Sequence, residues 1–188
     1  MIFLALFILG ALGLMVVASF LEWTVHRFLM HRPLGKFRYP YERHALIHHR
    51  IFQSDKTYHM INPKDIETVP MAWWNGPVLI CTFSSPFALI SWLTGQWAVY
   101  FGAFFATVLY YIAYEYSHWC MHLPKDRQLE QLKVFRFLNR HHLLHHRFMK
   151  KNFNVVFPLA DIVMGTYLAK APVPFEQVTG PAVPNVQP

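Results

Sequence analysis

The feature that most constrains the fold is the stretch 68–114, in which 47 residues include no charged residue and no histidine. A second stretch without charge covers residues 1–21. A helix of about 20 apolar residues crosses the ~30 Å hydrocarbon core of a bilayer. The stretch 68–114 therefore has room for two crossings and the stretch 1–21 for one. The pattern predicts an all-α integral membrane protein with about three transmembrane helices.

The longer stretch is expected to form a helical hairpin, with helices over about residues 69–93 and 96–116. The break falls at Thr94, Gly95 and Gln96, a polar triplet typical of a turn. The stretch 1–21 is interpreted as a retained helix and not as a cleaved signal peptide. No basic segment precedes it, and a histidine motif follows it directly.

The basic residues predict how the chain crosses the membrane. All 17 Lys and Arg residues lie within 27–64 or 125–170, on either side of the hairpin. By the positive-inside rule both segments face the cytoplasm. We expect a bacterial inner membrane more than the endoplasmic reticulum, with a helical cap on the cytoplasmic face. Residues 1–170 are expected to form one domain, with an amphipathic helix within 126–151 and a short apolar element over 157–168. The Pro-rich tail 171–188 is expected to be disordered.

Twelve histidines form the second informative pattern, because all of them lie in these two basic segments or at the membrane ends that border them. Eleven of them form four clusters, and His59 stands apart. Residues three or four positions apart share one face of a helix. Most of the clusters have this spacing and can direct two or three imidazoles to one point. The clusters are His26 and His31; His44, His48 and His49; His118 and His122; and His141, His142, His145 and His146.

His26 and His31 are five residues apart, which suits an ideal α-helix poorly. Either the helix ends near Arg32 and Pro33 and His31 turns inward, or the two histidines bind different metals. Ten to twelve histidines match two metal ions with about five ligands each, since two tetrahedral sites would use only about eight. Imidazole alone does not choose among iron, zinc, copper and nickel. We expect Glu22 and Glu115 to orient ligand histidines from outside the ligand set.

These clusters resemble the fatty acid hydroxylase branch of the membrane fatty acid hydroxylase/sterol desaturase superfamily. The resemblance covers roughly residues 22–167. It is carried by the segments 22–31 (EWTVHRFLMH), 118–122 (HWCMH) and 141–146 (HHLLHH), followed by 158–161 (PLAD). The second cluster, 44–49 (HALIHH), is one residue longer than the family pattern, and Ala160 stands where the family often has tryptophan. His59 is more like a histidine of the sterol-modifying branch.

The resemblance implies O2-dependent hydroxylation of a lipid acyl chain at a centre of two iron ions, with zinc a possible occupant after isolation. It implies that all eleven clustered histidines are ligands, leaves His59 open, and adds Asp161 to the supporting carboxylates. No fused cytochrome-like domain is recognisable, so electrons would come from a separate ferredoxin- or cytochrome-type protein. Carotenoid or sterol hydroxylation or desaturation is the alternative within the superfamily.

Other classes of function fit the sequence less well. The formal net charge of +7 could indicate nucleic acid, but there is no dense basic run, and 54% of the residues are hydrophobic, so we expect no nucleic-acid partner. A histidine-rich metal transporter or buffer should place ligands near the middle of the membrane, where this chain has none. A purely structural membrane protein would leave the histidine clusters unexplained.

Overall fold

The computed structural model describes residues 1–171, which are all-helical and contain no strand. Residues of the predicted tail from 172 onward lie outside the described residues. Two π-helical turns, η1 and η2, and two 3₁₀ turns, η3 and η4, occur among the α-helices. In chain order the elements are α1 (Ile2–Val25), η1 (His26–Met30), α2 (Tyr39–Tyr41), η2 (Glu42–His48), α3 (His49–Ile51), η3 (Lys56–Tyr58), η4 (Pro63–Thr68), α4 (Asn75–Thr94), α5 (Trp97–His122), α6 (Gln128–Gln131), α7 (Lys133–Arg147) and α8 (Leu159–Val163).

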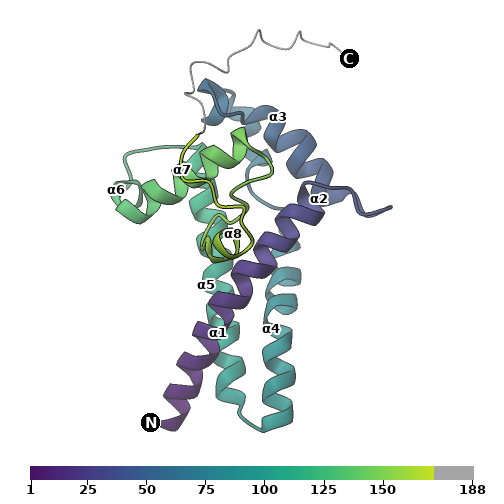
Figure 1. Ribbon diagram of the computed structural model, residues 1–188, viewed down its shortest axis with the longest axis vertical. Helices are drawn as coiled ribbons and strands as arrows, with labels where there is room; N and C mark the ends of the chain where they lie inside the picture. Colours follow the sequence, from purple (N-terminus) through teal and green to yellow (C-terminus); the bar gives the residue numbers. More distant parts are fainter. Residues whose placement is uncertain (172–188) are drawn as a thin grey trace.

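Within residues 1–171, three helices are long and apolar enough to cross a membrane, as predicted. They are Ile2–Met30, which joins α1 to η1, and the two helices Asn75–Thr94 and Trp97–His122. Figure 1 shows the N-terminus and the α4–α5 turn at one end of this bundle, and α2, α3 and α7 at the other. Large apolar side chains such as Leu12, Phe101 and Ile112 are exposed on the long helices, as expected where a bilayer surrounds them.

The hairpin differs from its predicted bounds at both ends, because α4 begins at Asn75 and not near Val69, and α5 continues to His122 and not only to about Tyr116. Pro70 cannot donate a backbone hydrogen bond, and the Met71 N–H donates instead to the Glu115 carboxylate, at 3.2 and 3.4 Å. The turn is confirmed at Gly95, whose φ of 72° is a left-handed conformation that glycine adopts without strain.

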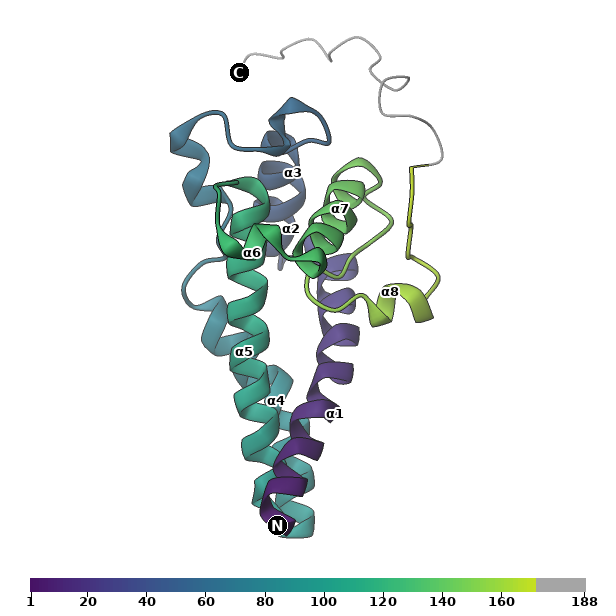
Figure 2. The same cartoon turned by 90° about the vertical axis from the view of Figure 1, so that its left-hand side faces the viewer.

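Helices α1 and α5 cross at two glycines that let their backbones touch. A Cβ added at Gly102 would lie 1.9 Å from the Phe7 carbonyl oxygen, and one added at Gly10 would lie 2.0 Å from the Val99 carbonyl oxygen. Close approach at small residues is how helices associate in a membrane, where apolar burial alone gives little driving force. Beyond this crossing, Figure 2 shows α1 diverging from α4 and α5 toward the end where α3 and α7 lie.

Gly102→Ala should therefore destabilise the bundle by about 1–3 kcal/mol, since a backbone has to move to accommodate one methyl group. Thermal unfolding in detergent measures the change. Gly13→Ala is the matched control, because its added Cβ would meet only the Phe87 ring, at 3.3 Å. Equal melting temperatures for the Gly102 variant and the unmodified chain would contradict the tight crossing.

The cap departs from the single amphipathic helix expected over 126–151. Two helices, α6 and α7, occupy this segment, and Leu132 between them is extended, with φ −68° and ψ 137°. This break directs Phe135 and Leu138 of α7 into a buried cluster with Tyr114 and Met121 of α5. The short apolar element predicted over 157–168 contains α8, which contacts α1.

Candidate metal centre

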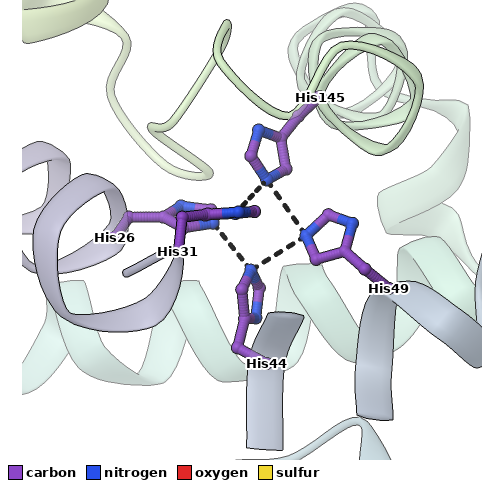
Figure 3. A group of neighbouring side chains, drawn as sticks. All are labelled: His26, His31, His44, His49 and His145. Carbon is purple, nitrogen blue, oxygen red and sulfur yellow. Dashed lines mark hydrogen bonds between the residues drawn. The ribbon is translucent and has the colours of Figure 1, made fainter. Parts of the chain in front are cut away.

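Ten of the twelve histidines form two groups of five, in each of which one ring nitrogen per residue lies within 4.8 Å of all the others. Nine of the ten are buried, and His31 is partly buried. Figure 3 shows the first group, with rings from three separate segments around one point. Group 1 comprises His26, His31, His44, His49 and His145, and group 2 comprises His48, His118, His122, His142 and His146.

In group 1 the Nε2 atoms face one another. Those of His26 and His44 are 2.8 Å apart, and His49 Nε2 lies 3.0 Å from His44 Nε2. His145 Nε2 closes the ring at 3.0 Å from His31 Nε2 and 3.2 Å from His49 Nε2. The group therefore presents five imidazole nitrogens to a common centre, from α1–η1, η2–α3 and α7.

Group 2 has the same character. The Nε2 atom of His142 lies 3.2 Å from that of His122 and 3.0 Å from that of His146. The Nε2 atoms of His48 and His118 are buried with no hydrogen-bond partner in residues 1–171. An unsatisfied buried ring nitrogen costs about 1–3 kcal/mol, so two in one group indicate that something else binds there.

A π-turn brings His26 and His31 together. The His31 N–H donates to the His26 carbonyl, at 3.1 Å, which is the i→i+5 bond of a π-helix. The two rings stack with centroids 5.0 Å apart and both belong to group 1. Of the two predicted explanations, the inward turn of His31 is the one found, and the reason is the π-turn that precedes Arg32.

The second and fourth clusters divide between the groups, contrary to the prediction that each cluster points to one place. His44 and His49, five residues apart, share group 1, whereas His48 belongs to group 2. The π-turn η2 is the cause, because it changes which positions share a face. On α7, His142 and His146 belong to group 2 and His145 to group 1. His118 and His122 stay together, as expected from their spacing of four.

Backbone carbonyls fix the orientation of four of these rings. The His145 Nδ1–H donates to the Lys151 carbonyl at 2.7 Å, and the His146 Nδ1–H donates to the Phe52 carbonyl at 2.5 Å. His122 Nδ1 is held at 2.8 Å by the Tyr58 carbonyl, and His26 Nδ1 by that of Phe153. A carbonyl only accepts, so each of these rings carries its proton on Nδ1 and directs the Nε2 lone pair into its group.

Burial favours the neutral form of the grouped imidazoles on η2 and α7. It lowers the pKa of His145 to about 4, and burial followed by repulsion from neighbouring imidazoles lowers the pKa values of His44 and His142 well below 6.5. Neutral imidazole is the form that binds metal ions. Nitrogen ligands about 2.0–2.1 Å from an ion lie about 2.9 Å apart at right angles. The Nε2 separations of 2.8 to 3.2 Å fit that arrangement. The two groups therefore fit two metal ions.

The two glutamates predicted to support the ligands contact no histidine through a described hydrogen bond. Glu115 accepts from the Met71 N–H, and Tyr114, one position earlier, packs against His118 instead, with ring centroids 5.8 Å apart. Glu22 accepts from the Tyr110 hydroxyl at 2.5 Å and the Val155 N–H at 2.6 Å. Glu22 thus joins α1, α5 and the loop after α7, which carries two of the orienting carbonyls.

Asp161 is bonded to both a histidine and that loop. Its carboxylate lies 3.1 Å from His141 Nε2 and accepts from the backbone N–H groups of Phe153 (2.9 Å) and Asn154 (2.7 Å). Asp161 therefore positions the Phe153 carbonyl, which holds His26.

Two predicted ligands lie outside both groups. His141 is buried on α7 and directs its Nε2 toward Asp161. His59 is exposed beside Tyr58, with ring centroids 5.3 Å apart. Sequence reasoning also missed the four orienting carbonyls, of Phe52, Tyr58, Lys151 and Phe153, because any residue supplies a carbonyl and no side-chain pattern marks one.

An apolar cavity of about 260 Å³ adjoins both groups. His44 of group 1 and His48 and His118 of group 2 form part of its lining. Apolar residues of α1 and α4, including Val25, Leu79 and Phe83, form much of its wall. The cavity therefore connects the histidines with the membrane-spanning part of the molecule.

Comparison with known proteins gives one match. The family model described as "Fatty acid hydroxylase" matches residues 11–166, most of the chain. No curated protein and no solved structure matches significantly. The matched range includes all ten grouped histidines, and Glu22, Glu115 and Asp161 as well.

Proposed function

Since the chain belongs to the fatty acid hydroxylase family, we propose that it hydroxylates an acyl chain of a membrane lipid, using O2, at a centre of two iron ions. The observation that supports the proposal most strongly is that two adjacent groups of five histidines adjoin an apolar cavity between membrane helices. A metal transporter would need ligands along the spans, and the histidines lie at one end of them.

The ligands we propose are the ten grouped histidines, without His141 and His59. Their Nε2 lone pairs converge because backbone carbonyls hold Nδ1 on the far side of four rings. We assign Asp161 and Glu22 to positioning the loop that carries two of these carbonyls. Two bound iron ions would supply the redox activation of O2 that an unactivated C–H bond requires. Zinc has no redox chemistry and is proposed only as an occupant of isolated protein.

The substrate chain is proposed to lie in the 260 Å³ cavity, beside His44, His48 and His118. The apolar wall would hold the chain by burial and exclude water from the reacting carbon. Because α1 and α4 supply much of this wall, a lipid could reach it from the bilayer without crossing water. This arrangement supports a lipid substrate over a soluble one.

The reaction balances as R–H, O2, two electrons and two protons giving R–OH and water. A reductant has to supply the two electrons, and we propose a separate ferredoxin- or cytochrome-type protein that docks on the cytoplasmic face. A product analysis separates this proposal from its alternatives. These are a carotenoid or sterol substrate, and desaturation in place of hydroxylation.

Lipid analysis of a host that expresses the chain under oxygen-18 gas tests the proposal. We expect an acyl lipid heavier by one oxygen atom, with the label derived from O2 and not from water. The control is a host that expresses His142→Ala at the same protein level. A new lipid whose added oxygen carries no label, or no new lipid from a host that loads the protein with iron and expresses a reductant, would contradict the proposal.

A further inference from the structure

In the segment 152–169, which follows the last histidine cluster, polar side chains are buried and apolar side chains are exposed. All of its asparagine, aspartate and threonine side chains are buried: Asn152, Asn154 and Asp161 are 0% exposed and Thr166 is 6% exposed. Asp161 is the only charged residue in the segment. Soluble proteins direct such groups outward, toward water.

The outer surface of the same segment is apolar. Ile162 is 58% exposed, Val163 61% and Met164 48%, and Phe157 is exposed beside them. These side chains lie on and around α8. No charged side chain of residues 152–169 is exposed, and the Lys151 ammonium group, just before the segment, donates to the Gly165 carbonyl at 3.0 Å. An exposed apolar face of this kind marks a surface that contacts either a membrane or another protein.

The position of α8 along α1 identifies what covers it. The Ser19 hydroxyl of α1 donates to the Phe157 carbonyl at 2.6 Å and accepts from the Ala160 N–H at 2.9 Å. Ser19 lies within the membrane-crossing helix, eleven residues before its end at Met30. Eleven residues of helix correspond to about 16 Å. Figure 2 shows α8 beside α1, below the level of α7.

We infer that α8 and its flanking residues 157–164 are immersed in the acyl region of one leaflet of the bilayer. Lipid chains then cover Ile162, Val163 and Met164, in continuity with the exposed face of α1 at Val16. Within the segment, the Phe157 carbonyl and the Ala160 N–H bond to Ser19, and the Phe153 and Asn154 N–H groups bond to the Asp161 carboxylate, as backbone at this depth requires. The segment thus attaches the histidine groups to the membrane from the C-terminal side.

Site-directed fluorescence tests the depth of α8. In a Cys81→Ser background, which removes the exposed native cysteine, an environment-sensitive probe is attached at Val163→Cys. The control is the same probe at Lys56→Cys, an exposed position in the cap. Vesicles carry either nitroxide groups on the lipid acyl chains or iodide in the surrounding water.

We expect iodide to quench the Val163 probe several-fold less than the Lys56 probe, and the nitroxide lipid to quench it several-fold more. Met164→Cys gives a second reading if the first variant folds poorly. Equal quenching of both sites by iodide would overturn the inference. So would protection of the Val163 probe from both quenchers, as burial against a second copy of the chain would give. The measurement needs no enzyme activity.

Discussion

His142→Ala is expected to abolish hydroxylated lipid while the chain still inserts in the membrane. Its imidazole is fully buried in group 2, with Nε2 at 3.0 and 3.2 Å from those of His146 and His122. Loss of a residue that only supports a metal ligand typically costs about 10- to 100-fold in affinity or activity. Loss of a ligand should exceed that, so we expect a fall of more than about 100-fold in product per protein.

The same result is expected for alanine at His26, His48, His118, His145 and His146. His59→Ala is the matched control, because His59 is exposed and outside both groups, and it should keep near-normal activity. His141→Ala should give an intermediate loss, since it removes the partner of the Asp161 carboxylate without removing a ligand of either group. Product is compared at equal amounts of membrane-inserted protein, because ligand loss also destabilises a metal-dependent fold.

Normal product from several of the six variants would contradict the proposed ligand set. Failure of His59→Ala alone would instead extend it, by assigning a role to the one histidine outside the clusters. If product falls in every variant and the amount of inserted protein falls with it, the melting temperature of the purified protein in detergent distinguishes unfolding from the loss of a metal ligand.

The long uncharged stretches predicted the three membrane helices because burial in lipid imposes a simple requirement of length and composition. The turn at Gly95 was also predictable, because a polar triplet with a glycine favours a turn between two apolar helices. The start of α4 did not, because it depends on a tertiary contact between the Met71 N–H and Glu115, which is 44 residues away. Composition alone carries no information about that contact.

The histidine clusters predicted a metal centre, but the assignment of each ring to a group depended on helix register. Spacing of four on an α-helix would place His44 with His48. The π-turn η2 places His44 with His49 instead. A π-turn has no reliable sequence signature, so ideal α-helical periodicity led to the wrong pairing at this cluster.

The contact of the Glu115 carboxylate did not follow from spacing either. Glu115 shares a helical face with His118 in sequence, yet its side chain is engaged by a backbone N–H in the loop before α4. Four of the ten rings are instead held by backbone carbonyls. Because every residue carries a carbonyl, only the folded chain identifies which four serve. The Phe153 carbonyl, for example, reaches His26 only because the loop after α7 returns to α1.

Elemental analysis of purified protein should give two metal ions per chain, and variants in one group should give one. The two groups of five are separate sets with no shared residue, so each should load independently. The double variant His26→Ala/His44→Ala removes two of the five donors of group 1. The double variant His122→Ala/His146→Ala does the same in group 2. Each is expected to retain the ion bound by the untouched group.

Removal of both ions by a chelator should also lower the melting temperature, because ions that bind only the folded state stabilise it. At a free metal concentration 1,000 times the dissociation constant this stabilisation is about 4 kcal/mol per ion. Without the ions, two sets of buried imidazole lone pairs face each other at 2.8 to 3.2 Å.

His59→Ala again serves as the control for the metal count and should keep two ions. A single ion in the unmodified chain, purified without chelator and from metal-replete cells, would contradict the two-metal centre. So would a loss of both ions in each double variant with the fold intact, since that would mean one shared site and not two.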